Sequence, residues 1–300
     1  MIRDYESLCA FPQAMTHAGK FHADDVFSTA LLKILVPNLS VRRVFNVPED
    51  FEGIVYDIGL GEFDHHQNDV PVRENGVRYA AFGLLWRAFG KEIMKKGVPE
   101  EYLDAEVQRF DEKFVCPLDL DDNTGCGEPI ADIIGQFNPL WDSTEKPDTC
   151  FFRAVAFAKI ILENKFAGIF GIYRARKLVA EALEESGGGD IVVLNTYAPW
   201  RSVLIDSNAK FVVYPSQRGG WSAQVIPVSS EDNTPRCPFP ESWAGKPAEE
   251  LPGISGIAGL RFCHHGRFLV STNTPAQAKE ACRIALAKEA MKAALSGKEN

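Results

Sequence analysis

Histidine and aspartate side chains cluster in the first 125 residues of the chain. Four of the six histidines lie between positions 17 and 66, and the triplet Asp64-His65-His66 joins two of them to a carboxylate. Imidazole and carboxylate groups together suit divalent metals such as manganese. Two such ions about 3.5–4 Å apart can activate water for attack on phosphorus. These residue types therefore predict a two-metal phosphoesterase site.

Two further groups precede the triplet. His17 and His22 are separated by Gly19, which allows the intervening loop to fold back so that both rings face one point. Asp24 follows at the mouth of the next helix, where an Asp is also an ordinary N-cap. Asp57 ends an apolar strand, where a carboxylate is costly unless it is hydrogen-bonded or coordinated. The group as a whole indicates metal ligation better than any one member does.

A third acidic group lies in LDLDDNTG at 118–125, with Asp119, Asp121 and Asp122. Its alternative explanation is a solvated turn. Without a cation, so many carboxylates in one crevice would repel each other and raise their pKa values. A pair of divalent metals removes that conflict. Manganese suits the mixed ligands best, with magnesium, cobalt or iron as alternatives.

Short apolar segments and helical repeats alternate around these groups. We predict strands at 11–15, 41–45 and 53–59, and helices near 24–36, at 79–90 and after Pro99. This alternation is typical of an α/β domain with a mostly parallel sheet. The carboxyl ends of such strands meet at one edge, where these folds bind ligands. The elements therefore place the three groups together.

The predicted secondary structure changes from helices to strands at SGGGD, residues 186–190, and this composition is typical of a linker. A helical segment at about 150–185 precedes it, and β-rich segments follow before a closing helix from Pro275. We predict two domains: a metal-binding catalytic domain at 1–186 and a smaller α+β substrate-binding domain at 187–300.

Composition bounds the function classes. Residues 186–300 hold 12 Lys and Arg against 10 Asp and Glu, a charge of +2. The first 185 residues hold 20 against 31, a charge of −11, and the two parts together give the net charge of −9. Such an acidic part binds nucleic acid poorly unless it holds a cation. Seven scattered cysteines without a CxxC motif predict a reducing, cytoplasmic setting. No apolar run reaches the roughly 20 residues that cross a bilayer, so no membrane association is expected.

At these residues the chain resembles the Myg (melanocyte-proliferating-gene) family of the DHH phosphoesterase superfamily. That superfamily includes RecJ-type exonucleases, nanoRNases and manganese-dependent pyrophosphatases. The resemblance covers nearly the whole chain. The motifs that carry it are THAGKFHADD (16–25), VYDIG (55–59), FDHHQ (63–67), RYAAFGLLWRAFG (78–90), LDLDDNTG (118–125), PWRSVLI (199–205), YPSQRGGWSAQVIPV (214–228), FPESWAG (239–245) and GISGIAGLRFCHHGRF (253–268).

The resemblance implies a role for each matched position. The first metal would be held by His17, His22 and Asp57. The second would be held by Asp24, Asp57, His65 and Asp119, with Asp57 bridging the two. Asp122 is the alternative to Asp119, and the sequence leaves that choice open. His66 would contact the scissile phosphate, and Asp64 would orient His65. In the second domain the expected substrate-binding residues are Arg201, Arg218, His264 and Arg267.

The leading hypothesis is a metal-dependent phosphodiester hydrolase, a 3′–5′ exonuclease on RNA or short oligonucleotides that uses a two-metal-activated water. One alternative keeps the site but acts on pyrophosphate or a small nucleotide. Another is a non-catalytic, metal-binding regulatory protein. A homodimer is compatible with the sequence.

Overall fold

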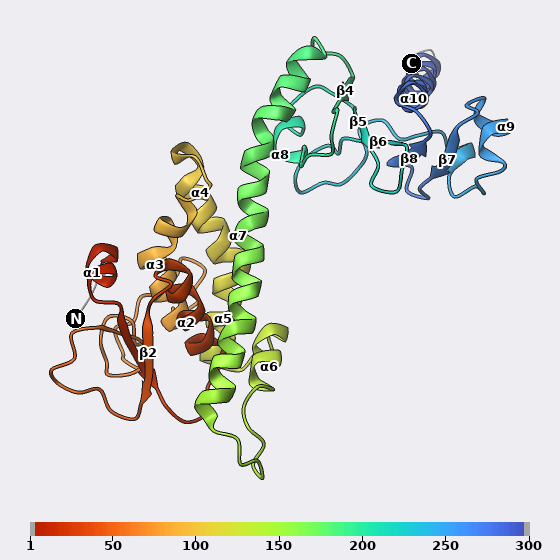
Figure 1. The fold of residues 1–300 in the computed structure, drawn as a ribbon. Helices are drawn as coiled ribbons and strands as arrows, with labels where there is room; N and C mark the ends of the chain where they lie inside the picture. The colour runs from red at the N-terminus through yellow and green to blue at the C-terminus, as the bar shows by residue number, and fades with distance from the viewer. Residues whose placement is uncertain (1–3, 297–300) are drawn as a thin grey trace. The chain divides into compact units, whose positions relative to one another are not determined.

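The computed structural model describes residues 4–296, and the chain forms two compact units (Figure 1). The first unit ends at Phe170 and the second begins at Gly171. This division falls inside α7 (Pro147–Glu185), a single helix of 39 residues. The Gly-rich segment at 186–190 follows the end of α7. The functional boundary at residues 186 and 187 stays a prediction.

The first unit contains a three-stranded parallel sheet in the order β2-β1-β3. Its strands are β1 (Gln13–His17), β2 (Ser40–Val44) and β3 (Ile54–Val55). The predicted parallel sheet is confirmed. The third strand is shorter than the predicted 53–59 because the chain turns at Asp57, with a φ of 55°, and at Gly59, with a φ of 87°. The turn directs the Asp57 side chain away from the regular strand pattern.

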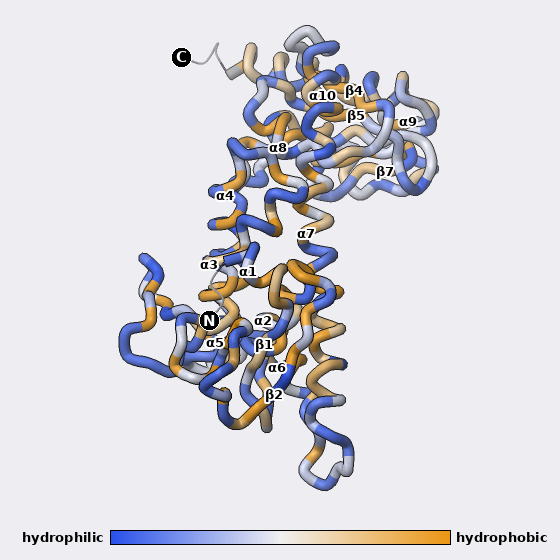
Figure 2. The backbone as a smooth tube through the Cα atoms, turned by 60° about the vertical axis from the view of Figure 1, so that its left-hand side comes forward, coloured by the Kyte–Doolittle hydropathy of each residue, from blue (hydrophilic) through white to orange (hydrophobic). Residues whose placement is uncertain are grey.

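The helices of this unit pack on one another. Phe27 of α2 (Ala23–Leu35) contacts Phe82 of α3 (Ala81–Met94) and Phe114, with ring centroids 5.6 and 5.5 Å apart. Apolar and polar residues alternate along α7 (Figure 2), and its buried residues Phe151, Leu162 and Phe166 belong to the first unit. The helices of this unit before α7 are α1 (Tyr5–Ala10), α2 (Ala23–Leu35), α3 (Ala81–Met94), α4 (Glu100–Phe110), the π-helix η1 (Asp111–Val115), α5 (Cys116–Thr124) and α6 (Pro129–Gly135).

The second unit contains a mixed five-stranded sheet in the order β4-β5-β6-β8-β7. Only β4 and β5 run parallel, and the other neighbours are antiparallel. The strands are β4 (Ile191–Val193), β5 (Phe211–Pro215), β6 (Trp221–Val225), β7 (Leu260–Cys263) and β8 (Leu269–Thr272). The helices are α8 (Arg201–Leu204), the 3₁₀ helix η2 (Glu241–Trp243), α9 (Leu251–Ser255) and α10 (Pro275–Ser296), the last of which packs on β5, β6 and β8. The mixed α/β class is therefore confirmed. Within residues 4–296, no helix is both long and apolar enough to span a bilayer.

Candidate metal centre

The carboxyl ends of β1 and β3 carry the first candidate ligands. His17 is the last residue of β1, and Asp57 follows the end of β3 by two residues. A pocket of about 1280 Å³ opens at this edge of the sheet, which is where parallel sheets bind ligands. Its titratable lining residues are His17, Lys20, His22, Asp57, Asp64, His65, His66, Arg78, Asp121, Asp122 and Asp132.

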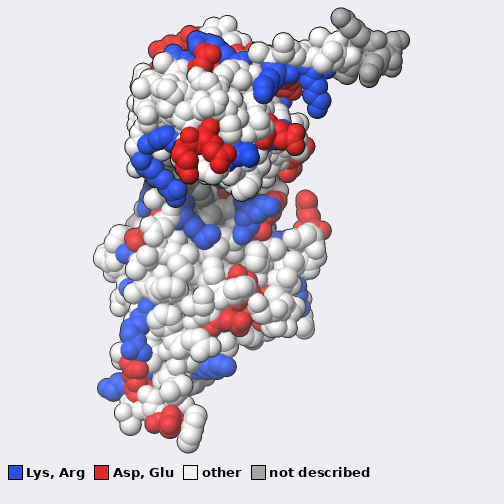
Figure 3. All heavy atoms as spheres, turned by 90° about the vertical axis from the view of Figure 1, so that its right-hand side faces the viewer, with Lys and Arg blue, Asp and Glu red and all other residues white. Residues whose placement is uncertain are grey.

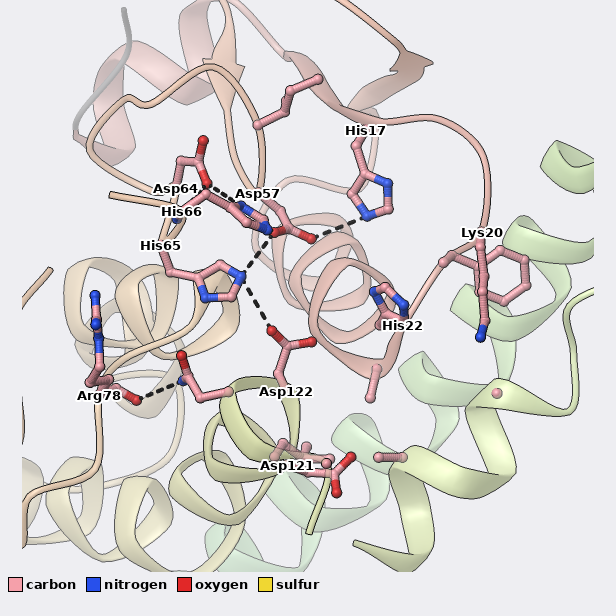
Figure 4. Close-up of a pocket in the computed structure, with 18 of the residues that line it drawn as sticks. His17, Lys20, His22, Asp57, Asp64, His65, His66, Arg78, Asp121 and Asp122 are labelled. Carbon is pink, nitrogen blue, oxygen red and sulfur yellow. Dashed lines mark hydrogen bonds and ion pairs between the residues drawn. The ribbon is translucent and has the colours of Figure 1, made fainter. Parts of the chain in front are cut away.

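Asp57 lies between two imidazoles (Figure 4). Its Oδ2 is 3.3 Å from Nε2 of His17, and its Oδ1 is 3.3 Å from Nε2 of His65. The Asp57 side chain is only 4% exposed, and its backbone adopts the left-handed region that non-glycine residues rarely occupy. Such backbone conformations cluster at functional sites. Asp57 thus presents one oxygen to each half of the pocket.

Asp25 completes the group around His17. Its Oδ2 lies 3.2 Å from Nε2 of His17, and its Oδ1 accepts a hydrogen bond of 2.9 Å from the backbone N–H of His22. Sequence reasoning missed Asp25, because it assigned the ligand role to its neighbour Asp24. The available signal was the second Asp of HADD, at the third position of α2, where a carboxylate caps the helix.

His65 is the centre of the second group. Its Nε2 lies 3.2 Å from Oδ2 of Asp122 and 4.0 Å from Oδ2 of Asp24. Asp24 is buried and accepts hydrogen bonds of 2.9 and 2.6 Å from the backbone N–H groups of Ala81 and Phe82, at the start of α3. The helix N-terminus therefore fixes the Asp24 carboxylate beside His65.

Asp119 does not line the pocket. Its Oδ2 accepts a hydrogen bond of 2.7 Å from Arg73, and its Oδ1 accepts one of 3.1 Å from the backbone N–H of Gly83. A Cβ at position 83 would lie 1.9 Å from Oδ2 of Asp119, so only glycine allows this approach. Of the two acidic residues that the sequence left open, the structure brings Asp122, and not Asp119, to His65.

Asp64 holds His66 rather than His65. Its Oδ1 lies 2.7 Å from Nδ1 of His66 and accepts from the His66 backbone N–H at 3.1 Å. Its Oδ2 accepts a hydrogen bond of 2.7 Å from the backbone N–H of Leu60. The side chain of His66 is 60% exposed and lines the pocket. The orientation that sequence reasoning expected for His65 is therefore found for its neighbour.

The donor set fits divalent cations. Among residues 4–296, three groups each bring three potential ligand atoms within 4.8 Å of one another. Asp25 Oδ2 and Asp57 Oδ1 are buried, and no hydrogen bond reaches either atom within the described part of the chain. Buried carboxylate oxygens that face imidazoles without a hydrogen bond are costly unless the rings are protonated or a metal cation is bound. The groups are His17-Asp25-Asp57, Asp24-His65-Asp122 and Asp57-His65-His66, and His22 lines the same pocket outside all three.

The electrostatics of the pocket also favour a cation. Burial raises the pKa of Asp24, and the charges of Asp57 and Asp122 raise it further. Burial lowers the pKa of His17, but Asp25 and Asp57 outweigh this effect and raise it to about 10. Burial likewise raises the pKa of Asp57, while His17 and His65 outweigh it and lower the pKa to about 2. Without a metal, protonated imidazoles balance the negative charge of these carboxylates. A bound metal would replace the protons in that role.

Of the four residues predicted to bind substrate, two line one pocket of the second unit and two do not. Arg218 and His264 line a pocket of about 600 Å³ together with Tyr197 and Phe262. Arg201 and Arg267 do not line it. Arg201 donates a hydrogen bond of 3.0 Å to Asn233, and Arg267 occupies a turn with a φ of 57°.

Comparison with known proteins gives consistent matches. Residues 13–286 match the profile labelled MYG1 exonuclease and described as Uncharacterised protein family (UPF0160). The MYG1 protein of Dictyostelium discoideum is 27% identical over 305 residues, which cover 86% of this chain and 92% of that protein. The MYG1 exonuclease of Homo sapiens is 28% identical over 338 residues, covering 95% of this chain and 89% of that protein. The MYG1 exonuclease of Rattus norvegicus is 28% identical over 95% of this chain and 87% of its own length. No solved structure matches significantly.

Proposed function

Because the chain belongs to the MYG1 exonuclease family, we propose that it is a metal-dependent hydrolase that removes nucleotides from RNA or short oligonucleotides. The names of its mammalian relatives support a hydrolytic nuclease. The clustered His and Asp residues support metal-dependent chemistry. We further propose that the first unit is a catalytic domain of the DHH type and that cleavage runs from the 3′ end.

The observation that carries this proposal is the position of Asp57. Its two oxygens face different imidazoles, those of His17 and His65, at the same distance of 3.3 Å. A carboxylate that shares its oxygens between two ligand groups is suited to bridge two ions. We propose that Asp57 is the bridging ligand of a dinuclear centre.

We propose one ligand set on each side of Asp57. His17 and Asp25 join it on one side, where His22 also lines the pocket. His65, Asp122 and Asp24 join it on the other. Manganese is the preferred ion for these mixed donors. When bound, the two ions would lower the pKa of a coordinated water and neutralise charge on the phosphate.

The remaining polar residues of the pocket can bind and orient the substrate. Asp64 fixes the ring of His66 at 2.7 Å, so His66 is prepared to contact the scissile phosphate or donate a proton to it. Lys20 and Arg78 lie on opposite sides of the cluster (Figure 4). Both line the pocket, and we propose that they contact phosphate groups.

The second unit offers a place for a base or a further phosphate. Its pocket combines Arg218, Arg261 and His264 with the rings of Tyr197 and Phe262, which are 50% and 44% exposed. Exposed aromatic rings beside arginines suit single-stranded nucleic acid, because bases stack on the rings. We propose that this pocket binds one nucleotide of the substrate.

The charge on one face of the molecule agrees with a short substrate. On the face shown in Figure 3, acidic and basic side chains are interspersed, and neither sign covers that face. Long duplex nucleic acid is held mainly through a continuous basic surface. A short strand anchored by metal ions needs no such surface.

A substrate panel tests this function. Purified chain with manganese is incubated with 5′-labelled oligoribonucleotide, oligodeoxyribonucleotide, cyclic dinucleotide and pyrophosphate. We expect a ladder of shortened, labelled oligoribonucleotides that disappears on chelation. Hydrolysis of pyrophosphate alone would select the pyrophosphatase alternative. Loss of the label as a mononucleotide from the outset would reverse the proposed polarity.

A further inference from the structure

Arg73 is a buried cation that lies outside the pocket. Its side chain is 6% exposed. Its Nε and Nη2 donate to the two oxygens of Asp111, each at 2.7 Å, and Nη2 also donates to Oδ2 of Asp119 at 2.7 Å. The guanidinium stacks on the ring of Tyr79, with Cζ 3.8 Å from the centroid. Such bidentate, charge-assisted contacts fix geometry strongly.

The two acidic partners of Arg73 occupy informative positions. Asp111 is the first residue of the π-helix η1, and Asp119 lies in α5, which follows η1 without a break. A π-helical turn is wider than an α-helical turn and so changes the direction in which later side chains point. Such turns are rare and frequently occur at functional sites. Arg73 thus connects the first residue of the π-helical turn to α5, the helix whose direction the turn changes.

Asp122 lies one helical turn after Asp119 in α5. Further hydrogen bonds hold the same stretch of α5. Asp119 accepts from Gly83 at 3.1 Å, and Asn123 donates to the backbone oxygens of Asp119 and Arg78 at 2.7 and 3.2 Å. The bond from Asn123 to Asp119 lies within α5, whereas those to Gly83 and Arg78 leave the helix. Rotation of α5 would break the latter two bonds and would turn Asp122 away from His65, which it now contacts at 3.2 Å.

We propose that Arg73 is a positioning residue of the metal centre. By holding Asp111 and Asp119 together it fixes the rotation of α5, and this rotation presents Asp122 to the pocket. The inference rests on the proposed role of Asp122 as a ligand. Arginine is required because its planar fork can bind Asp111 through two atoms while reaching Asp119. A lysine offers a single charged atom and cannot do both.

Manganese affinity, measured by titration calorimetry, tests the proposal independently of hydrolysis. Arg73→Lys and Arg73→Gln should bind manganese about 10–100-fold more weakly, as is usual when a group that orients a ligand is changed. Asp111→Asn is a milder variant that also loosens the clamp, and it should weaken binding in the same direction. Leu103→Val in α4 is the control: it alters a buried residue that does not line the pocket, and its affinity should match the wild type.

A double-mutant cycle identifies the route. If Arg73 acts through Asp122, Arg73→Gln should weaken binding in the wild-type background and have little further effect in Asp122→Asn. Equal losses in both backgrounds, or equal affinity of the wild type and all folded Arg73 and Asp111 variants, would overturn the positioning role. If the wild type itself binds no manganese, the proposed function fails along with this inference. These results are therefore distinguishable.

Discussion

Asp119 and Asp122 lie one turn apart in α5 but face different partners. Asp119 is fully buried against Arg73 at 2.7 Å, whereas Asp122 lies 3.2 Å from His65 and lines the pocket. One carboxylate thus belongs to the internal framework of the first unit, and the other belongs to the candidate metal centre.

Asparagine substitutions at these two positions should affect the stability of the metal-free protein differently. Asp122→Asn removes a charge that raises the pKa of Asp24 by repulsion, so the melting temperature should stay the same or rise while manganese affinity falls. Asp119→Asn weakens a buried ion pair, and breaking such pairs costs about 3–5 kcal/mol. Its melting temperature should fall. Calorimetry on both variants measures these changes. Unchanged manganese affinity in Asp122→Asn, together with lost manganese binding in Asp119→Asn, would reverse our assignment.

His66→Gln should separate chemistry from metal binding. His66 is largely exposed and is held by Asp64 at 2.7 Å, so its loss should leave manganese affinity close to that of the wild type. If His66 acts on the scissile phosphate, kcat should fall by about 10²–10⁴-fold. His265→Gln, a change at an exposed histidine in the second unit, is the matched control and should retain full activity. Equal rates for both variants would remove His66 from the mechanism.

Arg218→Gln tests the nucleotide pocket of the second unit. Arg218 lines that pocket with His264, so its removal should raise KM for oligoribonucleotides several-fold. The value of kcat should change little, because a contact made equally in the ground and transition states affects binding alone. Arg283→Gln in α10, where the arginine pairs with Glu280 at 3.3 Å, should leave both parameters unchanged. A fall in kcat without a change in KM would contradict a binding role.

Manganese binding should release protons. Asp25 and Asp57 raise the pKa of His17 to about 10 against the effect of its burial, so His17 is protonated at pH 8 in the metal-free protein. A metal ligand must be neutral imidazole, so binding displaces this proton, and apparent affinity should rise as pH approaches 10. The stabilisation of the metal-free fold by protonated His17 is complete below pH 6.5 and is lost as pH rises through about 10. Calorimetry in buffers of different ionisation enthalpy measures the release, and none at pH 8 would exclude His17 as a ligand.

The sequence predicts that the site lies at the carboxyl edge of the sheet and predicts several residues of the pocket, because strand ends and helix starts follow from local patterns. His17, Asp57 and His65 lie where those patterns place them. Adjacent acids are harder to distinguish. Asp119 is withdrawn from the pocket by Arg73, which is 46 residues away in the sequence, and local periodicity carries no signal of that contact.

Helical phase explains why Asp25, rather than Asp24, faces His17. Asp24 and Asp25 are neighbours in α2, so a rotation of about 100° separates the directions of their side chains. Asp25 faces His17, whereas Asp24 accepts hydrogen bonds from the start of α3. The π-helical turn before α5 likewise changes the phase at Asp122. Tertiary packing, rather than the motif alone, therefore decides which acid reaches the pocket.

The most direct test of the central claim is the rate at which Asp57→Asn, loaded with manganese, hydrolyses a labelled oligoribonucleotide. Asparagine tolerates the left-handed backbone at position 57, so the variant should fold, and circular dichroism can verify this. It lacks the charge and the second carboxylate oxygen that face His17 and His65. We predict a rate about 10³-fold or more below that of the wild type, comparable to the loss of a principal electrostatic group. A folded Asp57→Asn that hydrolyses the substrate at the wild-type rate would contradict the account.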